Sequence, residues 1–90
     1  MSFTRSTLAA ALSRLLAWKP TDRGELELWS RAAADVFSAL KESGSTLPDV
    51  PHVIWHFLSD ADIRMKDPAY ALEQEREVGR VIAGLESQEG

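Results

Sequence analysis

Apolar residues recur along this chain at the three- and four-residue spacing of an amphipathic α-helix. In residues 4–18 they fall in one broad arc at about 100° per residue, and Pro20 ends the run because proline lacks the N–H of a continuing helix. Residues 22–42 carry the most regular stripe, and Asp22 and Glu25 have capping-box spacing at its start. The positions expected to face a common core are Leu8, Ala11, Leu12, Leu15, Leu16, Trp18, Leu26, Trp29, Ala33, Val36, Phe37 and Leu40.

The second half of the chain predicts two further helices, at residues 50–60 and 68–86. Gly44 is expected to end the preceding helix in a left-handed C-cap conformation. Asp67 followed by Pro68 is typical of a helix start, with an N-cap residue and then proline at the first helical position. The expected core positions are Val50, Val53, Ile54, Phe57, Leu58 and Ala61, then Tyr70, Val78, Val81, Ile82 and Leu85, with Gln74 as a polar member. His52 and His56 fall on the opposite side of the third helix, so we expect them to face water.

These patterns predict an all-α fold, a small four-helix bundle-like domain with short, mainly antiparallel connections. A chain of 90 residues is one domain, residues 1–90, and its 44% hydrophobic and 27% charged shares are those of a globular protein. No stretch approaches the roughly 20 apolar residues that a membrane span needs. Cysteine is absent, which excludes disulfides, thiolate nucleophiles and zinc-finger sites and favours a reducing, cytoplasmic, bacterial-like setting.

The net charge of −4 opposes binding to nucleic acid, because each phosphate contact needs a lysine or arginine. The start of the chain is nevertheless basic, since Arg5, Arg14 and Lys19 all precede the first acid, Asp22. A targeting segment and a membrane-surface helix are therefore alternatives for the first helix. We favour a core helix, because the apolar stripe suits packing in the bundle.

Two histidines on the third helix give the sharpest chemical hypothesis. His52 and His56 are four residues apart and Asp60 follows one turn later, so the three side chains share a helix face and could reach one metal ion. Val53 stands where the metalloprotease motif has its glutamate. A metal-binding or hydrolytic protein therefore stays an alternative, and we expect no resident cofactor.

The connection before the fourth helix is densely charged, with Asp60, Asp62, Arg64, Lys66 and Asp67 in eight positions. A calcium loop is excluded, because Arg64 and Lys66 occupy places where ligand oxygens are needed. Two interpretations remain. The charges cap and pair locally, or they form a rigid patch beside His56 and Trp55 that docks a partner or a small polar ligand.

Trp55 lies between the apolar arc and the histidine arc of the third helix, a half-exposed setting in which aromatic residues are enriched at interfaces.

Glu73, Glu75 and Glu77 are expected to form a solvated face. Nucleophile-elbow and phosphate-loop motifs are absent, so we expect no enzyme. The predicted partner-binding residues are His52, Trp55, His56, Asp60, Asp62, Arg64, Asp67 and Tyr70.

The function that these observations favour is that of a small, acidic, non-catalytic protein-interaction or regulatory protein. In size and charge the chain looks like inhibitor- or immunity-type proteins that mask a basic partner, a comparison carried by composition alone. A homodimer is also expected, because a small core gains by burying leftover apolar surface such as Trp18 or Trp55.

Overall fold

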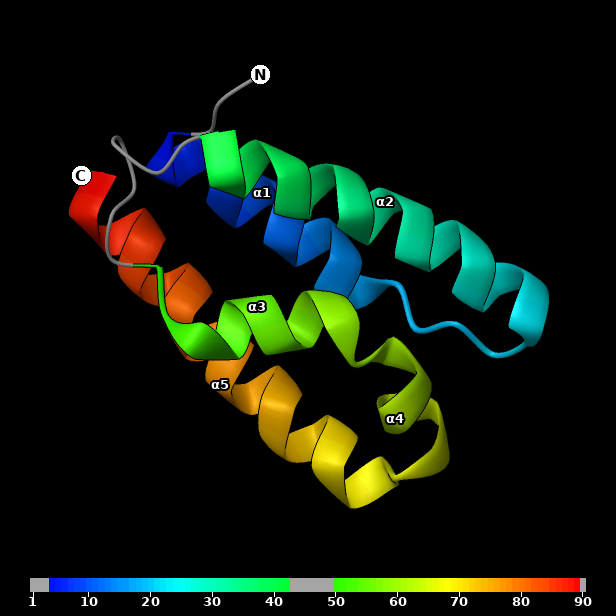
Figure 1. The fold of residues 1–90 in the computed structure, drawn as a ribbon. Coiled ribbons are helices and arrows are strands. Elements are labelled where there is room, and N and C mark those ends of the chain that lie inside the picture. Colours follow the sequence, from blue (N-terminus) through cyan, green and yellow to red (C-terminus); the bar gives the residue numbers. More distant parts are fainter. Residues whose placement is uncertain (1–3, 43–49, 90) are drawn as a thin grey trace.

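The computed structural model describes residues 4–42 and 50–89, and these residues form five α-helices and no strand (Figure 1). The all-α prediction is therefore confirmed. The predicted helix end at Gly44 lies outside the described residues. The helices are α1 (Arg5–Ala17), α2 (Arg23–Glu42), α3 (His52–Ser59), α4 (Ala61–Lys66) and α5 (Pro68–Glu89).

The charged connection is itself helical, which the four-helix prediction missed. Asp60 leaves helical geometry, with φ −107° and ψ 20°, and it separates α3 from the short α4. Alanine, methionine, lysine and arginine in α4 are strong helix formers, so the chain resumes a helix directly after this break. At the other end, α5 continues to Glu89 rather than ending near residue 86.

The long helices lie side by side, and the molecule measures 35 × 24 × 18 Å (Figure 1). Figure 1 shows α1 and α2 running in opposite directions, with α5 along the other side of α1. α3 fits between α2 and α5, and α4 turns the chain back into α5. This arrangement places the end of α3 and the whole of α4 against the first turns of α5.

The core is built around Trp29 of α2, whose side chain is 1% exposed. Its ring meets Phe57 of α3 edge to face, with centroids 5.5 Å apart and an interplanar angle of 85°. The predicted stripes supply most of the core, although Ala9 is buried and Ala11 is only half-buried. The buried apolar residues are Leu8, Ala9, Leu12, Leu15, Trp29, Ala33, Leu40, Ile54, Phe57, Leu58, Ala61, Val78 and Ile82.

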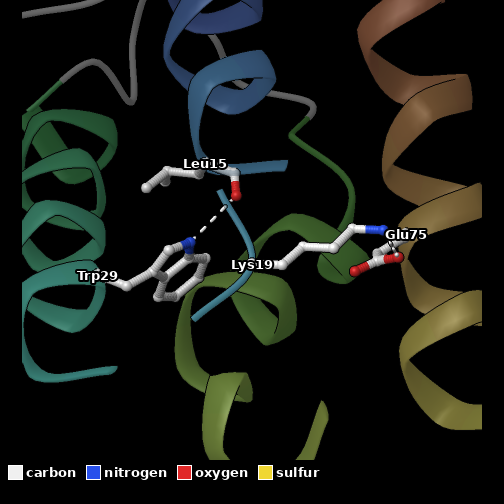
Figure 2. A network of polar contacts seen from close by, with 4 residues as sticks. All are labelled: Leu15, Lys19, Trp29 and Glu75. Carbon is white, nitrogen blue, oxygen red and sulfur yellow. Dashed lines mark hydrogen bonds and ion pairs between the residues drawn. The ribbon is translucent and has the colours of Figure 1, made fainter. Parts of the chain in front are cut away.

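Side chains satisfy the helix ends that the backbone leaves open. Asp22 Oδ1 accepts a hydrogen bond from the Glu25 amide at 2.8 Å, as the capping prediction requires. The Glu25 carboxylate does not complete the box, because it accepts instead from the Thr21 amide at 2.8 Å. The indole N–H of Trp29 donates to the carbonyl of Leu15 at 3.0 Å (Figure 2), and that carbonyl belongs to the last turn of α1.

The first helix uses its apolar face in the core. Leu8, Leu12 and Leu15 are buried there, which agrees with the bundle interpretation of α1. Within the two described ranges, residues 4–42 and 50–89, none of the helices combines the length and the apolar character of a membrane span.

Candidate functional site

Arg64 is the most heavily engaged polar side chain of the predicted site. Its Nη1 donates to the Phe57 carbonyl at 2.8 Å and to Gln74 Oε1 at 2.5 Å. The guanidinium carbon also lies 4.3 Å from the ring centroid of Phe57 and 4.9 Å from that of Trp29. The side chain therefore joins α4 to the core and to α5.

The short α4 explains how Arg64 reaches this position. Phe57 lies in the last turn of α3, whose carbonyls have no partner within their own helix. The break at Asp60 turns α4 back, so that a cation one turn into α4 meets the negative end of the α3 dipole. Partial burial lowers the pKa of Arg64, and nearby acids, Glu75 first among them, oppose that shift.

Asp60 is held by two side chains of α5. The Tyr70 hydroxyl donates to Asp60 Oδ2 at 2.6 Å, and Gln74 Nε2 donates to the Tyr70 oxygen at 3.0 Å and to Asp60 Oδ2 at 3.4 Å. The hydrogen bond to Asp60 raises the pKa of Tyr70, because it favours the protonated phenol. Gln74 is 5% exposed, so its polar place in the α5 stripe is explained by these bonds.

A groove of about 360 Å³ opens between α3 and α5 beside this network. Val53 and His56 line it from α3, and Tyr70, Gln74 and two glutamates line it from α5. The glutamates, Glu73 and Glu77, are one helical turn apart and both are exposed. We call this feature the α3–α5 groove.

The predicted site residues lie in several different parts of the structure. Asp60, Arg64 and Tyr70 belong to one hydrogen-bonded network that includes Gln74. His56 lines the α3–α5 groove, and both histidines are exposed as predicted.

The remaining predicted residues lie apart from the groove. Trp55 is half-buried against Phe37 of α2, with ring centroids 4.9 Å apart. Asp62 is exposed on α4. Asp67 caps α5 by accepting from the Tyr70 amide at 3.1 Å. The predicted residues therefore do not form a single patch.

Sequence reasoning missed Glu73 and Glu77 as site residues, since it assigned them to a solvated face. They are solvated, but their four-residue spacing also puts them on the one face of α5 that borders α3. The four-residue spacing was the one feature of the sequence that could have indicated that these two glutamates share a face.

The metal hypothesis finds no support in the part of the chain that the structure describes. Asp60 directs its Oδ2 to Tyr70 and Gln74, and no three histidine, aspartate or glutamate side chains in the described ranges are placed to hold an ion. His52 and His56 remain an exposed pair on α3.

Comparison with known proteins adds no relative. No protein-family model, curated protein or solved structure matches this chain.

Proposed function

We propose that this chain is a small, non-catalytic protein-interaction module that docks a basic segment of a partner protein in the α3–α5 groove. The observation that carries the proposal is the pair of carboxylates on the wall of the groove. Within the described side chains, no lysine or arginine nitrogen lies within 4.0 Å of Glu73 or Glu77. Two negative charges that form no ion pair among the described side chains favour a partner that supplies lysine or arginine.

The groove offers shape as well as charge. Tyr70 and Val53 present partly buried apolar surface beside the carboxylates, and His56 stands on the opposite wall. Tyrosine in such a setting is enriched among the residues that dominate binding energy. A partner could therefore lay the apolar stem of a lysine or arginine on Tyr70 and place its charge near Glu73 or Glu77.

The floor of the groove is ordered before any partner arrives. Tyr70 is fixed by Asp60 and Gln74, and Gln74 is fixed in turn by Arg64. A preformed surface loses less conformational entropy on binding than a flexible one. This rigidity supports recognition by docking.

The same hydrogen bonds support a binding role over a catalytic one. Asp60 accepts a hydrogen bond from the Tyr70 hydroxyl, and the pKa of Tyr70 moves up rather than down. A tyrosine that acts as a base or nucleophile needs the opposite shift. This proposal also keeps the inhibitor- or immunity-like role, the cytoplasmic setting and the homodimer. Sedimentation velocity on the purified chain would test the homodimer.

Quantitative affinity capture tests the docking proposal. The baits are the wild-type chain, the groove variant Glu73→Gln with Glu77→Gln, and a control variant Glu27→Gln with Asp35→Asn. The control removes the same charge from exposed positions of α2. Each bait is incubated with lysate of the organism that makes the protein, and bound proteins are eluted by rising salt.

We expect a basic protein that binds the wild type and the control but is lost from the groove variant and eluted by salt. Equal capture on all three baits would show that the groove carboxylates do not recognise the partner. Capture that is lost from the control alone would place the binding surface on α2.

A further inference from the structure

A second cleft, of about 400 Å³, lies where the end of α1 faces α4 and the start of α5. Its volume falls within the range of small-molecule sites, and its lining is mainly apolar. We call it the Arg64 cleft. Its lining includes Leu16 and Trp18 from α1, Phe57 from α3, Arg64 and Met65 from α4, and Leu72 from α5.

Arg64 brings a positive charge into this cleft without a bound counter-charge. Its printed hydrogen bonds go to two neutral acceptors, and no carboxylate oxygen of the described residues lies within 4.0 Å of it. A partly buried cation without a paired anion is costly, and partial burial accordingly lowers the pKa of Arg64. An anion in the cleft would offset that cost.

Donors for such an anion are free. Arginine carries five N–H groups, and only Nη1 of Arg64 is used within the described residues. No buried side-chain nitrogen in the described part of the chain lacks a hydrogen bond, so Nε and Nη2 of Arg64, which donate no hydrogen bond there, each keep some solvent-accessible surface. The Nε–Nη2 edge of a guanidinium suits the two oxygens of a carboxylate.

The rim of the cleft is apolar. Met65 is 39% exposed and Leu72 is 60% exposed, and both are among the few large apolar side chains that the fold leaves in water. Buried Phe57 forms part of the lining below them. Burying such surface contributes about 25 cal/mol per Å², so a ligand with a hydrocarbon part would gain from contact with the rim.

One ion pair stands at the same cleft. Lys19 Nζ lies 3.5 Å from Glu75 Oε1, and Figure 2 shows the lysine reaching from the segment after α1 toward α5. Lys19 thus offsets Glu75, the carboxylate that the described residues contribute to the cleft. The charge left over is that of Arg64.

We infer that the Arg64 cleft binds a singly charged, largely apolar carboxylate, with its oxygens against Arg64 and its hydrocarbon part along Met65 and Leu72. A single charge fits better than a polyanion, because Glu75, Asp60 and Asp62 all lie near enough to act electrostatically on Arg64. The acidic surroundings would repel a phosphate dianion more strongly than a carboxylate.

The inference does not depend on the docking proposal. On a helical wheel at about 100° per residue, Leu72 and Glu75 lie on one side of the buried α5 stripe, and Glu73 and Glu77 lie on the other. Leu72 can therefore be changed without touching the groove carboxylates, whereas Arg64 also holds Gln74 of the groove.

Titration of the full chain with three eight-carbon probes tests the inference. Octanoate and octanamide have the same alkyl chain, the chain of octylammonium is one carbon longer, and the three differ in charge. Binding is followed by two-dimensional amide and arginine side-chain NMR, with assigned signals of Arg64, Met65 and Leu72 as reporters. We expect octanoate to shift these signals and to bind about tenfold or more tightly than octanamide, because a charge-assisted hydrogen bond contributes about 1.5–3 kcal/mol.

Matched variants locate the site. Leu72→Glu should abolish octanoate binding, while Leu28→Glu should leave it unchanged, since Leu28 is similarly exposed, at 56%, but belongs to α2 and does not line the cleft. Arg64→Lys keeps the charge but loses the planar donor pair, so it should weaken octanoate and leave octanamide unaffected.

Equal affinity for octanamide and octanoate, preference for octylammonium, or octanoate binding that survives Leu72→Glu would each overturn the inference. A peptide ending in leucine that displaces octanoate and binds more tightly would also overturn it, since the cleft would then be a site for a protein C-terminus.

Discussion

The Tyr70 hydroxyl lies 2.6 Å from Asp60 Oδ2, and this hydrogen bond ties the first turn of the bundle's last helix to the residue that separates α3 from α4. It holds the floor of the α3–α5 groove and keeps the Asp60 carboxylate turned toward α5. The bond also links the stability of the fold to the ionisation of one phenol.

Loss of that bond should lower stability in a pH-dependent way. Tyr70→Phe should reduce the free energy of unfolding by about 1 kcal/mol, a typical contribution for one hydrogen bond. The pKa of Tyr70 is raised in the folded state above its unfolded value of about 10. The bond therefore stabilises fully below about pH 10, and its contribution is lost as the pH rises through the folded-state pKa.

Urea unfolding of the wild type and Tyr70→Phe at several pH values measures the effect. The difference between them should be constant near neutral pH and shrink at high pH. Tyr70 is the only tyrosine in the chain, so tyrosinate absorbance reports its ionisation directly. A titration midpoint at or below the ordinary tyrosine value would contradict the predicted hydrogen bond.

The indole of Trp29 should matter for its N–H as well as for its volume. Trp29→Phe removes the hydrogen bond to the Leu15 carbonyl and leaves a small cavity in the core. We expect a loss of about 2 kcal/mol, measured as a lower urea midpoint with an unchanged slope. Trp18→Phe, at a half-buried position, is the control and should cost less. Equal losses would mean that the bond to Leu15 contributes little.

The start of α2 depends on one capping side chain. Asp22→Ala removes the acceptor for the Glu25 amide, and loss of an N-cap of this kind costs about 1 kcal/mol. For a domain of this size, that loss corresponds to a melting temperature lower by roughly 4–8 °C. Asp35→Ala removes the same charge from an exposed position inside α2 and should change the melting temperature little. A larger effect at residue 35 would argue against the cap.

The fold was largely predictable because long amphipathic helices signal their buried faces by periodicity. The stripes of residues 22–42 and 68–86 placed Trp29, Val78 and Ile82 in the core, and the structure buries all three. α4 escaped prediction because its six residues are too few to show a helical period. No sequence pattern around Asp60 indicates the non-helical torsion angles by which this residue separates α3 from α4.

The candidate site was predictable only in part, because two helices form the groove and a helical wheel shows the faces of a single helix. Trp55 was placed correctly between two arcs, but the wheel could not tell that Phe37 of α2 would cover it. Glu73 and Glu77 gained their significance only when α3 was seen to lie beside them. Gln74 stood out in the sequence only as a polar member of an apolar stripe, and its hydrogen bonds to Arg64, Tyr70 and Asp60 became visible only in the structure.

Site-specific photo-cross-linking in the source organism tests the docking surface most directly. A photoreactive amino acid is introduced at position 73 on the wall of the α3–α5 groove or, as a control, at the exposed position 28 of α2. The account predicts a discrete adduct with a basic protein from position 73 and none from position 28. An adduct from position 28 alone, or no adduct from position 73, would contradict it.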